Sequence, residues 1–234
     1  MPGYAFVGQM GPGDKAPDID GRWKAQRRLD LLGGNNTLRY GMGAAIRSLA
    51  KLGVYPSEIG VDVLVLAAMV HATDTRVNRV QTSQDAWTRE LGIGVPVSDP
   101  DRWTAARPIV EKMLRFLTGD HWTVAFRRRP EGLADFVRRP VAGLHDHVFD
   151  RVALFSGGLD SLIGAIDRLE QGSFPLFISH GGEGAVSRPQ RDLFMDIASA
   201  YSRGNRQPSR IRVGMTFGEE VAPGIGREDT TRGR

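Results

Sequence analysis

The chain has 234 residues, of which 41% are hydrophobic and 25% charged, and it contains no cysteine, which excludes disulfides and cysteine-ligated zinc within it. The net charge of +4 is spread without a basic tail or stripe, so the sequence gives no indication of direct nucleic-acid binding. The longest apolar run, residues 61–70, is too short to span a bilayer, and no signal segment opens the chain. We therefore expect a cytoplasmic protein that does not contact membranes.

The first part of the chain predicts a mixture of helices and strands. Between the first expected strand and residue 36 the sequence is rich in Gly, Pro, Asp and Asn, which indicates loop. The expected elements are a strand at 4–7, helices at 37–52 and 57–75, a strand at 91–97, a helix at 100–117 and a strand at 121–126. We interpret residues 1–148 as an α+β N-terminal accessory domain.

From residue 149 onward the pattern becomes a regular alternation of strands and helices. The expected strands cover residues 151–155, 174–180 and 211–217, with helices after the first strand and at 187–201. Right-handed crossovers would make the strands parallel and place Ser156, His180 and Gly218 at one edge. Because the chain ends soon after the third strand, we interpret this α/β sheet as incomplete and the chain as C-terminally truncated.

The sequence S-G-G-L-D-S at residues 156–161 lies between the first of these strands and its helix. Two glycines allow a tight turn in which backbone N–H groups approach a ligand closely. The helix that follows adds the positive end of its dipole, and we expect Asp160 or Ser161 to cap it. This pattern predicts a site for an anion such as pyrophosphate. It matches neither the Walker A loop nor the G-x-G-x-x-G dinucleotide motif.

The loop resembles the PP-loop signature S-G-G-x-D-S of the ATP pyrophosphatases. Together with residues 178–180, 189–190 and 228–234, it resembles the QueC-like (7-cyano-7-deazaguanine synthase-like) branch of that family. Three earlier segments resemble the QueC-like component of the Qat anti-phage defence system, QatC; they are 71–76, 87–89 and 95–103. The resemblance implies a parallel-sheet α/β domain of the PP-loop (adenine nucleotide alpha hydrolase-like) class over residues 149–234.

The resemblance also implies an activity. A ligase or synthase of this branch would use ATP to adenylate the carboxylate of a carboxy-deazaguanine, release pyrophosphate, and go on to an amide or a nitrile. The implied cofactors are ATP and Mg²⁺, and the implied partners are the small-molecule deazaguanine and proteins of the defence system. Biosynthetic relatives hold zinc with cysteines, which this chain lacks.

The expected site residues follow from the loop and from the resemblance. Asp160 and Ser161 are the expected catalytic residues. His180 is either a cofactor-binding group or simply a polar residue at a strand end, and Gln190 is either a ligand contact or a helix-surface residue. The resemblance places Arg232 and Arg234 near the substrate; the alternative is a frayed, exposed terminus, which the expected truncation would make true of this chain. The residues expected to hold the phosphates are Ser156, Gly157, Gly158, Leu159, Asp160 and Ser161.

Two other functions fit the same sequence. One is a different PP-loop chemistry, such as tRNA or nucleoside modification, although the absence of cysteine disfavours thiolation. The other is a non-catalytic nucleotide-binding module that recruits a partner. His145 and His147, one residue apart, form no recognised metal site.

Overall fold

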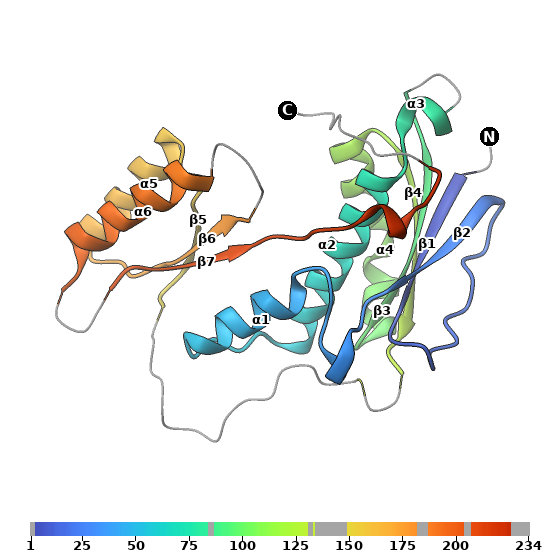
Figure 1. Ribbon diagram of the computed structural model, residues 1–234, viewed down its shortest axis with the longest axis horizontal. Coiled ribbons are helices and arrows are strands. Elements are labelled where there is room, and N and C mark those ends of the chain that lie inside the picture. The colour runs from blue at the N-terminus through green and yellow to red at the C-terminus, as the bar shows by residue number, and fades with distance from the viewer. Residues whose placement is uncertain are drawn as a thin grey trace. The chain divides into compact units, whose positions relative to one another are not determined.

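The computed structural model describes residues 3–83, 87–130, 133, 149–181, 187–203 and 207–225 (Figure 1). Its contacts divide the chain into two units that do not follow chain order. The first unit consists of residues 1–40, 56–138 and 216–234, and the second of residues 41–55 and 139–215. The expected boundary after residue 148 lies outside the described residues and stays a prediction.

The first unit contains a four-stranded sheet in the order β2-β1-β3-β4, and all of its strand pairs are parallel. The strands are β1 (Gly3–Gln9), β2 (Trp23–Asp30), β3 (Glu90–Val97) and β4 (His121–Arg128). This arrangement is α/β, so the expectation of an α+β domain is wrong in its sheet type. Strand β2 was not anticipated, because as an edge strand it is mostly polar and only partly buried.

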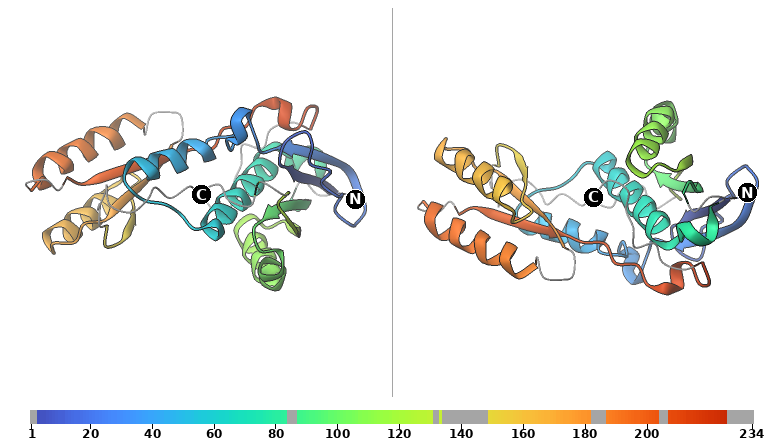
Figure 2. Two further views of the ribbon diagram at one scale, coloured as in Figure 1. Left: turned by 90° about the horizontal axis from the view of Figure 1, so that it is seen from below. Right: turned by 90° about the horizontal axis from the view of Figure 1, so that it is seen from above.

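Each face of this sheet is covered by a different part of the chain. On one face Ala5 and Val7 pack with Ala16 and Ile19 of the β1–β2 connection, while Trp23 packs against the same cluster. The other face is covered by α2 (Glu58–Arg76) and α4 (Pro100–Thr118), which pack on β3 and β4 (Figure 2). The β1–β2 and β2–β3 crossovers run in opposite directions across the sheet and lie on opposite faces, as uniform handedness requires.

The helices of this unit begin at side-chain caps. Ser57 accepts a hydrogen bond from Gly60 N–H at the start of α2, and Asp99 accepts one from Arg102 N–H at the start of α4. The left-handed Gly119 ends α4. The short helices are α3 (Arg79–Thr82), η1 (Gly34–Asn36) and η2 (Glu219–Val221).

Buried ion pairs lie at both ends of the strands of the first sheet. Before β4, Asp120 accepts hydrogen bonds from the guanidinium groups of Arg79, at 2.6 and 3.0 Å, and Arg89, at 2.6 and 3.1 Å. Beyond β3, the buried Asp62 pairs with Arg129 and accepts from Trp103 Nε1 at 2.9 Å. The segments 71–76, 87–89 and 95–103, which carry the resemblance to the defence branch, thus contribute several of these structural contacts.

The second unit contains a three-stranded parallel sheet in the order β5-β6-β7. A cluster of Phe155, Phe177 and Phe194, whose ring centroids are 5.8–5.9 Å apart, joins this sheet to the helices above it. The elements are β5 (Val152–Leu154), α5 (Leu159–Glu170), β6 (Leu176–His180), α6 (Ser187–Tyr201) and β7 (Ser209–Val213). The strand–helix alternation predicted from residue 149 is confirmed.

Helix α1 (Met42–Lys51) packs against β7 and therefore belongs to the second unit. Figure 1 shows α5 and α6 on one side of the three-stranded sheet and α1 on the other. The sequence predicted this helix within the first domain. An amphipathic pattern shows that one face of a helix is buried, but it does not show which sheet buries that face. No helix among the described residues is long and apolar enough to cross a membrane.

Candidate functional site

The glycine loop joins β5 to α5 at the carboxyl edge of the second sheet, meaning the edge at which its parallel strands end. Phe155 fixes the start of the loop, since its ring is buried and its N–H donates to the Ile178 carbonyl at 2.8 Å. Leu162 N–H donates to the Gly158 carbonyl at 3.0 Å, which starts the helical hydrogen bonding of α5. The predicted strand–loop–helix geometry is confirmed.

The two glycines of the loop have different roles. Gly157 has φ of +82°, and a Cβ there would lie 2.9 Å from Cα and Cβ of Gln190. Gly158 has an ordinary φ of −83°, and its Cβ would meet only Ser156 Oγ, at 3.6 Å. Folding of the loop therefore requires glycine at residue 157. Glycine at residue 158 leaves the backbone open to close approach by a ligand.

Two serine hydroxyl groups line the loop. Ser161 Oγ accepts a hydrogen bond from Gly157 N–H at 3.1 Å and donates to the Gly158 carbonyl at 2.8 Å. Ser156 Oγ lies 3.1 Å from Ser161 Oγ and accepts from Gly158 N–H at 3.3 Å. The signature thus brings two hydroxyls and two glycine N–H groups together in one turn.

The N-cap of α5 is Gly158, which makes no side-chain cap hydrogen bond. The expectation that Asp160 or Ser161 would cap the helix is therefore wrong, because the helix begins at Leu159, before either residue. The first-turn N–H groups of α5 have no protein acceptor among the described residues, and an anion can bind there. The Leu159 and Asp160 side chains are exposed, so Leu159 can contribute to such a site only through its N–H.

Gln190 of α6 supports the loop from behind. Its buried side chain donates through Nε2 to the carbonyls of Phe155, at 3.4 Å, and Ser156, at 3.2 Å. Gln190 is therefore not a helix-surface residue. The sequence contained the signal, since Gln190, Phe194 and Ile197 have the i, i+4, i+7 spacing of one helix face, and all three are buried. Ser179 adds a third contact, donating to the Phe155 carbonyl at 2.7 Å.

Arg210 of β7 lies behind Gln190. Its Nη1 donates to Oε1 of Gln190 at 3.3 Å, and its guanidinium lies 5.0 Å from the centroid of the Phe194 ring. Burial lowers the pKa of Arg210, and the positive charges of Arg212 and Arg191 lower it further. This cation orients the amide that holds the loop.

His180 is exposed at the end of β6, on the same edge of the sheet as the loop. Gly218 does not share this edge as predicted, because β7 ends at Val213 and residue 218 belongs to the first unit. Gly214 takes its place. A Cβ on Gly214 would lie 2.7 Å from the Gly181 carbonyl oxygen, so the chain segments leaving β6 and β7 touch through glycine backbone.

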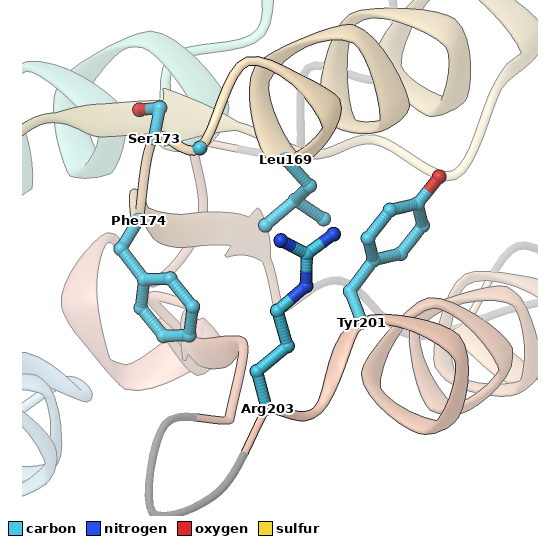
Figure 3. Close-up of a pocket in the computed structure, with 6 residues that line it drawn as sticks. Leu169, Ser173, Phe174, Tyr201 and Arg203 are labelled. Carbon is cyan, nitrogen blue, oxygen red and sulfur yellow. The ribbon is translucent and has the colours of Figure 1, made fainter.

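A small cavity of about 250 Å³ lies at the opposite edge of this sheet, where the strands begin (Figure 3). The Arg203 guanidinium points between Leu169 and Tyr201, and Phe174 lines the other side. Tyr201 donates to Glu170 at 2.6 Å, and this hydrogen bond raises the tyrosine's pKa. The cavity and the glycine loop lie at opposite ends of the strands of this sheet.

Arg232 and Arg234, expected near the substrate, lie outside the described residues, and so do His145 and His147, which the sequence did not indicate as a metal site. Where the structure describes the chain, no three His, Asp or Glu side chains are grouped as a metal site would require. The donors at the loop fit phosphate oxygens, while Asp160 supplies the one carboxylate of residues 156–161.

The second unit is therefore an α/β unit with a serine- and glycine-lined turn and a helix amino terminus together at its carboxyl edge. Comparison with known proteins gives no match, since no family model fits the chain and no curated protein or solved structure is significantly similar to it.

Proposed function

We propose that residues 156–161 bind the phosphates of ATP and that the protein uses ATP to adenylate a carboxylate, with release of pyrophosphate. The observation that carries the proposal is the loop itself, a turn held by the Ser156 and Ser161 hydroxyls, after which the first-turn N–H groups of α5 have no acceptor among the described residues. A polyphosphate suits these groups because it accepts hydrogen bonds on several oxygens and carries the charge that the helix dipole favours.

In the proposed reaction a carboxylate oxygen attacks the α-phosphorus of ATP. The bond from that phosphorus to the oxygen bridging to the β-phosphate breaks, and pyrophosphate leaves with the electron pair. An amine can then displace AMP from the acyl adenylate to form an amide. The first-turn N–H groups of α5 would stabilise negative charge on the departing pyrophosphate. Mg²⁺ would neutralise phosphate oxygens, and the exposed Asp160 would supply it with a carboxylate.

The acid in this proposal is a carboxy-deazaguanine, and the biological setting is anti-phage defence. Both come from the sequence resemblance to the QueC-like branch. In this proposal His180, exposed at the same edge as the loop, would contact the nucleotide.

The test is exchange of labelled pyrophosphate into ATP in the presence of carboxy-deazaguanine. Gly158→Ala should abolish exchange while leaving the melting temperature almost unchanged, because its Cβ enters the ligand's space without a protein clash. Gly164→Ala, in the same helix, is the matched control, since a Cβ there meets nothing within 4 Å. We expect it to retain full exchange and to gain up to about 1 kcal/mol in stability.

Equal exchange by the wild type and the Gly158→Ala variant would refute the proposal. ATP binding without exchange for this or any other acid would instead show a non-catalytic nucleotide-binding unit. Exchange with a different acid would keep the ATP chemistry and reject the deazaguanine.

A further inference from the structure

The first unit has a hollow of about 530 Å³ at the carboxyl ends of β1 and β2. One wall is the loop after β1, residues 10–13, and the other is the segment after β2, which includes Gly33, Gly34 and Asn36. In open parallel sheets ligands bind beyond the carboxyl ends of the strands, and this volume is within the range of small-molecule sites. The hollow is thus in the position and of the size expected for a ligand site.

Hydrogen bonds and an ion pair, all made by Asp14, hold the loop after β1. Asp14 accepts a hydrogen bond from Met10 N–H at 2.8 Å and pairs with Arg127 of β4, and its carbonyl accepts from Gln9 Nε2 at 2.9 Å. Gly11 has φ of +86°. A Cβ on Gly13 would meet nothing within 4 Å, so a ligand can approach the backbone closely there.

The opposite wall of the hollow, the segment after β2, contains residues in rarely populated backbone conformations. Asn35, Asn36 and Tyr40 have φ of 57°, 53° and 54°, and they are the three non-glycine residues with positive φ in the described part of the chain. Such conformations cost free energy and persist where surrounding contacts impose them. Here Gly33 N–H donates to the Thr37 carbonyl at 2.8 Å, and Tyr40 stacks on Phe217 with centroids 4.6 Å apart.

Two charged side chains line the hollow between these walls. Asp30, the last residue of β2, accepts hydrogen bonds through Oδ1 from the N–H groups of Gly11 and Leu32, both at 3.3 Å. Its Oδ2 lies 3.6 Å from Nη1 of Arg39. Both side chains are 42% exposed, so each can also contact a ligand. Asp30 therefore joins the two walls and keeps part of its carboxylate exposed.

We propose that this hollow binds a phosphorylated sugar of the ribose type, free or as part of a nucleotide. Asp30 accepts hydrogen bonds from vicinal hydroxyls, the task that an acidic residue at the end of a second strand performs in nucleotide-binding α/β sheets. Arg39 pairs with the phosphate through its guanidinium. Of the residues that line the hollow, those in a helix belong to the three-residue η1, so the cation takes the place of a helix dipole. This site is independent of the glycine loop at residues 156–161.

The experiment is calorimetric titration of the full chain with ribose 5-phosphate, and separately with ribose and with inorganic phosphate. Ribose 5-phosphate should bind more tightly than either half. Asp30→Asn and Arg39→Gln should each weaken binding by about tenfold or more, because each removes a charge-assisted contact. Asp30→Asn also alters two backbone hydrogen bonds. If it lowers the melting temperature, the affinity of the Arg39→Gln variant for ribose 5-phosphate is the deciding measurement.

The matched controls are Asp18→Asn and Arg28→Gln, which break another exposed ion pair of the same unit, 2.9 Å apart. They should leave the affinity unchanged, and so should Gly158→Ala, which separates this site from the proposed ATP site. Absence of binding to the wild type, equal weakening by the controls, or phosphate binding as tightly as ribose 5-phosphate would each overturn the proposal.

Discussion

The two units differ in how they fix the carboxyl edges of their parallel sheets. In the first unit, charged side chains hold the edge, as the pairs Asp14–Arg127, Asp30–Arg39 and Asp62–Arg129 show. In the second unit, the loop is held by a left-handed glycine, by a buried amide and by aromatic packing. In the second unit, helix N–H groups can therefore bind an anion. In the first unit, an anion at the carboxyl edge would have to be bound by a positively charged side chain.

The largest expected effect concerns the buried charges of the first unit. Asp120→Ala leaves Arg79 and Arg89 without their shared carboxylate and should cost about 3–5 kcal/mol of unfolding free energy. Chemical denaturation followed by hydrogen exchange would show whether the loss is confined to the first unit. The exposed Asp18→Ala is the control and should cost less than about 0.5 kcal/mol. An equal loss of hydrogen-exchange protection in the second sheet would show that these ion pairs do not act on the first unit alone.

Gly157→Ala tests whether backbone geometry holds the glycine loop. The Cβ meets the backbone of Gln190, and φ of +82° is unfavourable for alanine, so we expect a loss of about 1–3 kcal/mol together with loss of pyrophosphate exchange. Gly158→Ala should lose exchange alone. Thermal melts of the two variants side by side provide the measurement. Identical melting temperatures would show that the two glycines do not differ as the structure indicates.

Gln190 tests the same contrast, because its buried side chain holds the loop by donating to two loop carbonyls. Gln190→Ala leaves the Phe155 and Ser156 carbonyls without their amide donor and should cost about 1–2 kcal/mol. Because the loop would be less ordered in this variant, we expect kcat for pyrophosphate exchange to fall. Gln190→Glu keeps the shape but removes the donor, so a fully active Gln190→Glu variant would show that the amide hydrogen bonds are dispensable.

The smallest effect concerns Asp150, which joins the start of β5 to the turn before β6. The Ser173 hydroxyl, donating at 2.7 Å, lowers the pKa of Asp150 below its ordinary 3.8, and Arg151 and Phe174 N–H act in the same direction. Because the folded-state pKa is depressed, this stabilisation is present above pH 3.8 and is lost as pH falls through the folded value. Asp150→Asn should therefore destabilise slightly at neutral pH and not at the acid limit. A stability difference that grows on acidification would contradict this sign.

Local patterns were enough to predict most elements. Periodicity indicated α2, α4 and α6, and the apolar run before Ser156 indicated β5, because helices and strands with one buried face carry a regular spacing. Strand β2 was missed, since an edge strand with the sequence K-A-Q-R-R-L-D has no apolar alternation. The end of β7 was placed too late, because the apolar pattern continues past Val213, whereas the strand pairing with β6 does not.

By itself the sequence determined the strand–loop–helix turn at residues 156–161, since a glycine pair, hydroxyls and a helix start are all local features. Only the tertiary structure decided that Gly157, not Gly158, needs left-handed backbone, that Gln190 holds the loop, and that α1 joins the second sheet. It also brought Gly11 and Arg39 together around Asp30. The reason is physical: φ and ψ preferences act over a few residues, whereas burial and charge pairing depend on which distant segments meet.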